Sequence, residues 1–199
     1  CRHRHDGLSH AKCYDSQHPE ERIGFLDIEA TSLNASFGYM LSYCIKLAGG
    51  PVLKRAIKPS EIRRHSYDKE LCKQFLLDVQ DFDRLIGYYS SRFDVPFLRT
   101  RCLYWRLGFP PFGSLYHTDA YYAVRGKLRL HRNRLEAACD LFGIPSKGHR
   151  LNPSVWQAAQ TGDKRAIDFV LRHNVEDVES LEALWLRLNG QVRFTKTSL

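Results

Sequence analysis

Three short apolar runs near the start of the chain predict β-strands. Residues 23–30 (IGFLDIEA) are apolar except at two acidic positions and lead into a polar turn, which is typical of a buried strand. Residues 39–47 and 51–58 predict two further strands, separated by residues 48–50 (AGG). A Gly-Gly pair between apolar runs favours a tight hairpin, so we expect an antiparallel meander.

After residue 60 the apolar positions recur at helical spacing, and helices and strands then alternate. Near the C-terminal end, capping signals define the helices: Asn133 with Glu136 predicts a capping box for a helix that ends at Phe142. The expected elements are, in order, a helix around 71–79, a strand in 84–89, a helix at 95–107, a strand in 114–121, and helices at 133–142, from 152–153 and over 163–188. This order predicts an α/β fold, a mixed sheet with helices on both faces.

Length and composition fit one soluble domain with a small appendage. The chain has 199 residues, of which 43% are apolar and 26% charged. Residues 1–21 are polar, His-rich and without periodicity, so we separate this segment from a domain at 22–199. Lys and Arg exceed Asp and Glu by 30 − 22 = 8, a surplus that favours a polyanionic partner such as nucleic acid.

No apolar run approaches the ~20 residues that span a bilayer, so we expect no membrane partner. No hydrophobic segment at the start resembles a signal peptide. Cys44, Cys72, Cys102 and Cys139 lie in apolar surroundings, which favours buried free thiols in a reducing compartment. We therefore expect a cytoplasmic protein.

Two carboxylates interrupt the first strand. Asp27 and Glu29 are two residues apart, so both side chains point to one face of the sheet. Adjacent carboxylates in a buried strand repel each other and are costly to desolvate, and a divalent cation would remove that cost. The alternative is a strand end exposed to water.

Two further acids have ordinary explanations when each is taken alone. Asp94 follows a predicted strand and is suited to cap a helix. Asp177 and His173 lie one helical turn apart and could be a solvated surface pair. Together with the strand pair, however, these acids could hold Mg²⁺ or Mn²⁺, and two such ions form a clamp for displacement at phosphorus.

The segments GFLDIEATSL, GYYSSRFDVPFL and HNVEDVESL occur in this order. The pattern resembles the DEDD 3′–5′ exonucleases of the ribonuclease H-like superfamily, and looks closest to the branch related to the exonuclease domain of family-B DNA polymerases, of bacterial or phage type. The resemblance covers about residues 22–188 and implies a ribonuclease H-like mixed five-stranded sheet. The stretch 117–147 is similar to the strand, basic hairpin and helix that precede the last motif.

The resemblance implies roles for individual residues. Asp27 would bridge two ions, Glu29 and Asp177 would hold the ion that activates water, and Asp94 would act on the second ion. His173 falls on the residue that orients or deprotonates the attacking water. In addition, the turn after Glu29 would meet the terminal nucleotide through Thr31 and Leu33.

The chain departs from the family pattern at two positions. The family has Tyr four residues before the last Asp or His five residues before it, whereas this chain has His173 at the Tyr spacing. A His at i, i+4 can still face the metal, so we keep it as a general base or water-orienting residue. Relatives often have Asn five residues before the second-motif Asp, where this chain has Tyr89, which leaves a substrate contact there open.

A basic run flanks the expected site. Single Lys and Arg residues are usually solvated, but this run adjoins the site in the resemblance, which favours contact with the phosphates of a strand. The residues expected to bind substrate in this run are Arg125, Lys127, Arg129 and Arg132.

The first thirteen residues, CRHRHDGLSHAKC, suggest a structural zinc site. A Cys₂His₂ set is a common tetrahedral zinc site, and two of these residues have normal ligand spacing. The alternatives are a tag remnant or a basic tail. The candidate ligands are Cys1, His10 and Cys13, with His3 and His5 competing for the fourth position.

The sequence as a whole predicts a metal-dependent 3′–5′ exonuclease that acts on single-stranded ends of DNA or RNA. The alternatives are a nucleic-acid-binding module without activity and a structure-specific endonuclease of the same superfamily. Expected cofactors are two Mg²⁺ or Mn²⁺ ions and a structural Zn²⁺. Replication or repair proteins are expected as further partners.

Overall fold

A computed structural model of the chain describes residues 21–145, 152–188, 190–192 and 197–199. Its centre is a five-stranded sheet with the spatial order β3-β2-β1-β4-β5. The first three strands pair antiparallel, whereas β4 and β5 run parallel to β1. The predicted mixed sheet is therefore confirmed. The strands are β1 (Ile23–Ala30), β2 (Met40–Leu47), β3 (Val52–Ala56), β4 (Arg84–Gly87) and β5 (Tyr116–Asp119).

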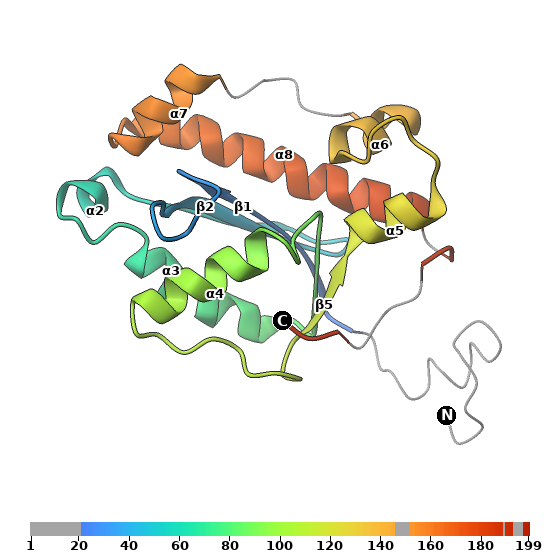
Figure 1. Cartoon of the computed structure of the whole chain (residues 1–199), viewed down its shortest axis with the longest axis horizontal. Coiled ribbons are helices and arrows are strands. Elements are labelled where there is room, and N and C mark those ends of the chain that lie inside the picture. Colours follow the sequence, from blue (N-terminus) through green and yellow to red (C-terminus); the bar gives the residue numbers. More distant parts are fainter. Residues whose placement is uncertain (1–20, 146–151, 189, 193–196) are drawn as a thin grey trace.

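Helices cover both faces of this sheet, as expected. Figure 1 shows the long helix α8 lying across one face, with α6 and α7 on the same side, and α3 and α4 on the other side. The helices are α2 (Pro59–Arg63), α3 (Lys69–Asp78), α4 (Asp94–Tyr104), α5 (Ala120–Lys127), α6 (Leu135–Leu141), α7 (Pro153–Gln160) and α8 (Lys164–Leu188).

The chain forms the predicted meander because its turns and apolar positions agree. Gly49 has φ +65°, a left-handed conformation that glycine adopts without a steric cost, and it turns the chain between β2 and β3. In β1, Leu26 and Ile28 are buried in the largest core cluster. Because side chains alternate along a strand, Asp27 and Glu29 face the opposite side of the sheet.

Two local predictions were wrong. The capping box at Asn133 does not form, because α6 begins at Leu135 with Arg134 as its N-cap, and the carbonyl of Asn133 instead accepts a hydrogen bond from Tyr88 Oη. The segment expected to form a basic hairpin begins with α5, which Asp119 caps by accepting a hydrogen bond from the amide of Tyr121. Its first basic residues therefore lie on a helix.

The expected cap of α7 and the expected burial of four cysteines hold. Asn152 caps α7 by accepting a hydrogen bond from the amide of Val155, and the four cysteines at 44, 72, 102 and 139 are buried and free. In the part of the chain that the structure describes, no helix is both long enough and apolar enough to cross a membrane.

Candidate metal centre

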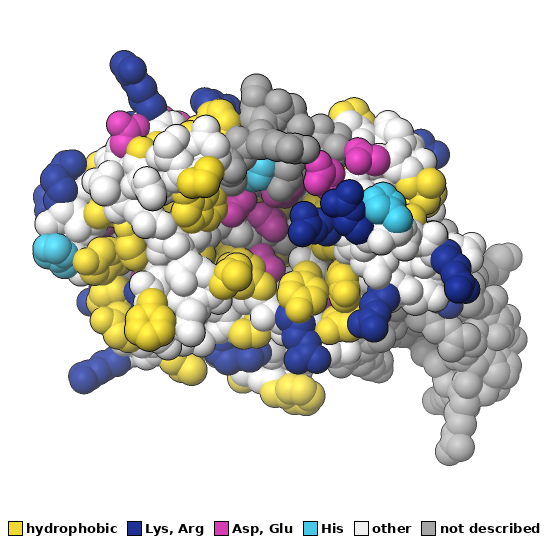
Figure 2. Space-filling model, turned by 45° about the horizontal axis from the view of Figure 1, so that its top comes forward, with side chains coloured by type: hydrophobic (Ala, Val, Ile, Leu, Met, Phe, Trp, Pro, Cys, Tyr) yellow, Lys and Arg dark blue, Asp and Glu magenta, His cyan; other side chains and the backbone are white. Residues whose placement is uncertain are grey.

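The four carboxylates that the sequence singled out line one pocket. This pocket has a volume of about 460 Å³ and is lined by Asp27, Glu29, Asp94 and Asp177, together with Leu33, Tyr88, Tyr89 and Arg92. Figure 2 shows acidic side chains at the bottom of a hollow, with hydrophobic and basic side chains around its rim. Residues that are 150 positions apart in the sequence thus meet at a single site.

β1 supplies Asp27 and Glu29, and both side chains are half-buried. Asp27 Oδ2 accepts a hydrogen bond of 3.1 Å from Asn174 Nδ2 on α8. A β-bulge follows Glu29, because the pairing register with β2 shifts between Glu29 and Ala30. Bulges occur next to active sites, where they redirect side chains and end the regular pairing.

The turn after β4 brings Asp94 against β1. Gly87 ends β4, and a Cβ atom there would lie only 2.2 Å from Ser90 Oγ, so the close fold of this turn requires glycine. Asp94 is the first residue of α4 and not its N-cap, which is Phe93. Its Oδ1 accepts a hydrogen bond of 3.0 Å from the amide of Ile28. The carboxylate of Asp94 thus points from α4 to the strand that carries the first two acids.

Burial changes the acidity of Asp94. Its side chain is only 3% exposed, and this loss of solvation raises the pKa of Asp94 to about 7. The amide of Ile28 opposes the rise in this pKa, and the nearby carboxylates of Asp119 and Asp177 add to it. A cation bound in the pocket would favour the charged form of all these carboxylates.

α8 brings His173 and Asp177 over the sheet. Its apolar face fixes this position, because Val178 and Leu181 pack in one cluster with Phe25 of β1. His173 and Asp177 are each 6% exposed, and His173 Nε2 lies 3.9 Å from Asp177 Oδ2. The structure therefore does not show the solvated helical pair that was the simpler alternative.

One set of side-chain atoms is close enough together to hold an ion. Glu29, His173 and Asp177 each offer one ligand atom, and all three atoms lie within 4.8 Å of one another. Carboxylate oxygens suit Mg²⁺ and Mn²⁺, and an imidazole nitrogen is compatible with Mn²⁺ and Zn²⁺. The residues present thus fit the divalent cation that the sequence led us to expect.

The turn after β1 presents one of the two residues expected to meet the substrate. Leu33 lines the pocket and is 88% exposed. Thr31, in contrast, is tied to its own loop: its Oγ1 accepts a hydrogen bond from the amide of Tyr39, and its carbonyl accepts one from Gln160 Nε2 on α7. A further bond from Arg101 Nη1 to the carbonyl of Ala35 anchors the other side of this loop.

The basic run borders a second pocket. Arg125, Lys127 and Arg129 line this pocket of about 430 Å³, which the end of α5 forms with the chain that follows it. Arg132 is exposed a few residues further on. Tyr88 connects the two pockets, because it lines the acidic one and its hydroxyl donates to the carbonyl of Asn133, which lines the basic one.

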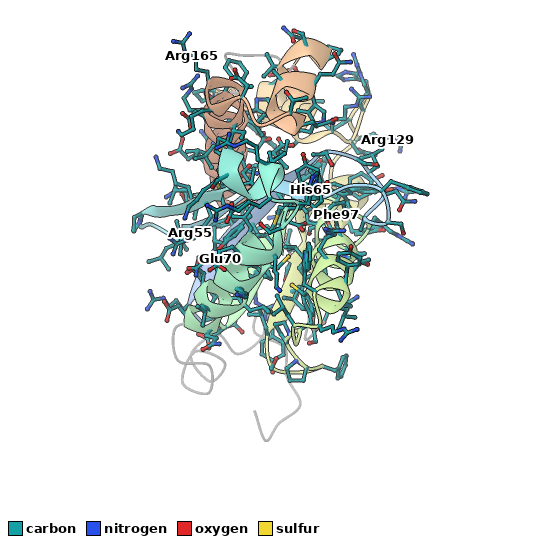
Figure 3. All side chains as sticks on the ribbon, turned by 90° about the vertical axis from the view of Figure 1, so that its left-hand side faces the viewer. Arg55, His65, Glu70, Phe97, Arg129 and Arg165 are labelled. Carbon is teal, nitrogen blue, oxygen red and sulfur yellow. The ribbon has the colours of Figure 1, made fainter. Side chains whose placement is uncertain are left out.

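Figure 3 labels Arg129 on one side of the molecule and Arg55 of β3 on the other. Arg55 is paired with Asp78 at 3.0 Å. The basic run at 125–132 is therefore separate from the positive charge on β3. The proposed zinc ligands Cys1, His3, His5, His10 and Cys13 lie outside the described residues, as does most of the segment 1–21, and the zinc site stays a prediction.

The sequence did not indicate three of the residues that shape this centre. Asn174 adjoins His173 in the sequence, yet only the packing of α8 on β1 places its amide against Asp27. Arg92 lies two residues before Asp94 and enters the pocket because of the turn after β4. Asp119 ends β5 and binds that turn through backbone amides.

A family model described as the RNase_H superfamily matches residues 24–189. The chain belongs to this superfamily, which confirms the ribonuclease H-like superfamily that the three acidic motifs indicated. A search of the curated proteins found no match.

Among solved structures, the chain is similar to the family B DNA polymerase from the hyperthermophilic archaeon Pyrobaculum calidifontis, with a TM-score of 0.67 and 18% sequence identity. The match covers 85% of this chain and 25% of the polymerase, so the chain spans about a quarter of that protein's length. At this identity the similarity concerns the fold.

Proposed function

We propose that this protein is a divalent-metal-dependent nuclease that acts as a 3′–5′ exonuclease on the single-stranded ends of DNA or RNA. The observation that carries the proposal is the convergence of Asp27, Glu29, Asp94 and Asp177 on one pocket, with His173 beside Asp177. Membership of the RNase_H superfamily supports the same chemistry.

The four carboxylates would hold the metal ions. Bound Mg²⁺ or Mn²⁺ would supply a Lewis acid for the scissile phosphate and a hydroxide near neutral pH. Two hydrogen bonds orient the carboxylates. Asn174 Nδ2 donates to Asp27, and the amide of Ile28 donates to Asp94. Two of these carboxylates are buried and two are half-buried, and like charges so close together are costly without cations, which supports a role in cation binding.

His173 is placed to move a proton. Its Nε2 lies 3.9 Å from Asp177 Oδ2, and one of its ring nitrogens lies within 4.8 Å of a carboxylate oxygen of both Glu29 and Asp177. A water molecule between these groups would be within reach of the imidazole, which could accept its proton as the water attacks phosphorus.

The surroundings of the pocket support a nucleic-acid substrate. The basic run Arg125, Lys127, Arg129 and Arg132 adjoins the site through Tyr88, and such residues bind phosphates of a strand. The exposed Leu33 lies at the pocket, where an apolar side chain can contact a terminal base. A pocket of about 460 Å³ is in the range of small-ligand sites, which suits one terminal nucleotide. The buried free thiols support a reducing compartment, so we keep a cytoplasmic location in the proposal.

Cleavage of end-labelled strands tests the function. Single-stranded DNA and RNA, labelled at the 5′ end, are incubated with Mg²⁺, Mn²⁺ or EDTA, together with a circular single strand. The proposal expects stepwise shortening from the 3′ end, no cleavage of the circle and no reaction in EDTA. Cleavage of the circle would establish an endonuclease, and binding without any cleavage would establish the non-catalytic module.

The control for this experiment is Asp27→Asn, which keeps the acceptor for Asn174 and removes one charge. It should abolish cleavage while the protein stays folded, because water cannot replace a carboxylate that holds two ions. Wild-type turnover by Asp27→Asn would contradict the assignment of the site.

A further inference from the structure

The turn between β4 and α4 presents a tyrosine and an arginine to the acidic pocket. Tyr89 and Arg92 both line it, and Tyr89 is 47% exposed. Tyr89 has φ +61°, in the left-handed region. A bulky residue adopts this conformation only where its surroundings fix it, and such residues cluster at functional sites.

Asp119, at the end of β5, fixes this turn. Its Oδ1 accepts hydrogen bonds from the amides of Tyr89 (2.8 Å) and Tyr121 (3.0 Å). Its Oδ2 accepts from the amide of Ser91 (2.9 Å) and from the Ser91 hydroxyl. One carboxylate thus holds the turn after β4 and the start of α5 together, and the direction of the Tyr89 side chain is set in advance.

Neighbouring tyrosines support the Tyr89 ring from the side. The ring centroids of Tyr89 and Tyr121 are 4.9 Å apart with an interplanar angle of 77°, and those of Tyr121 and Tyr122 are 5.2 Å apart at 84°. In such edge-to-face contacts one ring presents its edge to the face of the other, and the half-exposed Tyr89 ring keeps part of its surface open to a ligand.

Arg92 provides hydrogen-bond donors beside this ring. Its Nε donates to Tyr122 Oη at 3.2 Å, and this bond lowers the pKa of the Tyr122 hydroxyl. Among the described residues, neither Nη of Arg92 has a hydrogen-bond partner. The planar guanidinium can therefore still form two parallel bonds to a phosphate.

We propose that Tyr89 and Arg92 form a nucleotide subsite in the wall of the pocket, where the Tyr89 ring stacks on a base and Arg92 binds a phosphate of the same unpaired strand. This inference rests on the proposed function and specifies its substrate: a strand end whose base is free to stack. A paired base is already stacked between its neighbours, so the ring can reach its face only in a single strand.

A free phosphate ion as the ligand would not explain why a tyrosine ring lies beside the arginine. The floor of the pocket carries four carboxylates, which repel an isolated anion, and the half-exposed ring offers nothing to one. A nucleotide uses both groups, because it joins an aromatic base to a phosphate. The ring and the arginine together therefore indicate a nucleotide of a strand.

The experiment uses single-stranded oligonucleotides with one abasic position, placed first, second or third from the 3′ end, in DNA and RNA forms. Their Kd values are measured for the wild type, Tyr89→Gly, Tyr89→Phe and, as a matched aromatic control, Phe112→Ala. Glycine adopts the left-handed conformation without a steric cost, so Tyr89→Gly removes the ring without straining the turn. Phe112 is 90% exposed, lies in the loop before β5, and is not among the residues that line the pocket.

The wild type should bind an end that lacks the base at one position roughly 5- to 150-fold more weakly than the intact end, as expected for one stacked base. Tyr89→Gly should lose a similar factor on the intact end and nothing more on the abasic one. Tyr89→Phe and Phe112→Ala should behave as the wild type. Comparison of the Kd values for the DNA and RNA oligonucleotides shows whether the subsite distinguishes deoxyribose from ribose.

Arg92→Gln tests the phosphate contact. It should reduce the slope of log Kd against log salt concentration by about 0.7, the value for one phosphate in a single strand. Arg165→Gln, on the exposed start of α8, should leave the slope unchanged.

The inference is overturned if Tyr89→Gly, folded as judged by circular dichroism, keeps the wild-type preference for an intact base, or if Arg92→Gln keeps the wild-type slope. Failure of the proposed function looks different. In that case the wild type neither binds nor cleaves strand ends, and Asp27→Asn is indistinguishable from it.

Discussion

Asp94 shows at the scale of one residue how burial changes a carboxylate of the candidate metal centre. The folded chain holds the proton on this buried carboxyl up to about pH 7, whereas an unperturbed Asp loses it near pH 3.8. Between these values the folded state binds more protons than the unfolded state. The stability of the metal-free protein therefore falls as pH rises through this window.

Asp94→Asn should accordingly stabilise the metal-free protein at pH 8, by an amount on the order of a few kcal/mol. Asn keeps an oxygen for the amide of Ile28 and removes the buried charge. The gain should shrink as pH is lowered from 7 towards 4. Thermal unfolding in EDTA at pH 5 and pH 8 measures this difference. An equal Tm for both proteins at pH 8 would show that the charge of Asp94 is already compensated without metal.

His173→Ala separates two roles of that imidazole. If the ring only moves a proton, the cleavage rate should fall roughly 10²- to 10⁴-fold while the Kd for Mn²⁺ stays near the wild-type value. If the ring is a metal ligand, the Kd for Mn²⁺ should rise as well. Titration calorimetry with Mn²⁺, measured beside single-turnover cleavage, distinguishes these outcomes.

His173→Tyr is the matched variant for this comparison. Tyr occupies this spacing in one branch of the DEDD exonucleases that the chain resembles, and its hydroxyl can orient a water molecule. It should recover part of the rate lost in His173→Ala. A His173→Ala protein that cleaves within a few-fold of the wild type would assign His173 to packing alone.

At the scale of elements, a buried ion pair joins the helices under the sheet to the loop at the pocket. Asp68 is fully buried and accepts hydrogen bonds from Arg101 Nε (2.8 Å) and Nη2 (2.7 Å) of α4. It also accepts from Trp105 Nε1 and from the amide of Met40 at the start of β2. Arg101 then reaches the carbonyl of Ala35. α4, which begins with Asp94, is thereby fixed to the loop that carries Leu33.

Arg101→Met should destabilise the protein by about 3–5 kcal/mol, because it leaves the carboxylate of Asp68 buried without its counter-ion. Adding Asp68→Asn should recover part of this loss, because it removes the buried charge. The single oxygen of the amide can still accept from one of the two remaining donors, Trp105 Nε1 or the amide of Met40. Urea unfolding of the two single variants and the double variant gives the coupling. Additive losses would show that the pair contributes no mutual stabilisation.

The elements that sequence patterns predicted are those whose signals are local. β1, its meander and α8 follow from short apolar runs, a Gly-Gly turn and a long apolar stripe. α5 was missed because its cap, Asp119, belongs to a strand, and its Gly126 weakens a helical pattern. The capping box at Asn133 failed because α6 begins one residue later than the pattern indicated, with Arg134 as its N-cap.

The same distinction holds for the site. Asp27 and Glu29 stand out because they are charged residues in an apolar strand, and the order of the acidic motifs indicated their partners. Asn174 and Arg101 were not found, because their importance depends on one contact each with a residue far along the chain. Burial of a polar side chain against a specific partner has no signature in the local sequence.

At the scale of the whole molecule, charge is divided between an acidic pocket and a basic surround. The net charge of +8 attracts a polyanion, while the four carboxylates that line the pocket repel a phosphate. Figure 3 shows that positive side chains are spread over the molecule, with Arg165 and Arg55 on a different side from Arg129. If the net charge alone attracts a strand, the position of each basic residue does not matter. If the basic run at 125–132 contacts the strand, only the residues of that run should matter.

Lys127→Gln with Arg129→Gln tests the location of charge. If both residues contact phosphates, the slope of log Kd against log salt concentration for a single-stranded oligonucleotide should fall by about 1.4, or 0.7 for each contact. The cleavage rate at saturating strand should change little, because neither residue reaches the acidic pocket. The control is Lys73→Gln with Arg165→Gln, which removes the same two charges from the exposed surfaces of α3 and α8. This control should leave the slope near the wild-type value, because residues that contact no phosphate do not contribute to the counterion release that sets the slope. Equal slopes for the two double variants would show that the basic run acts only through the overall charge and that the strand leaves the pocket in another direction.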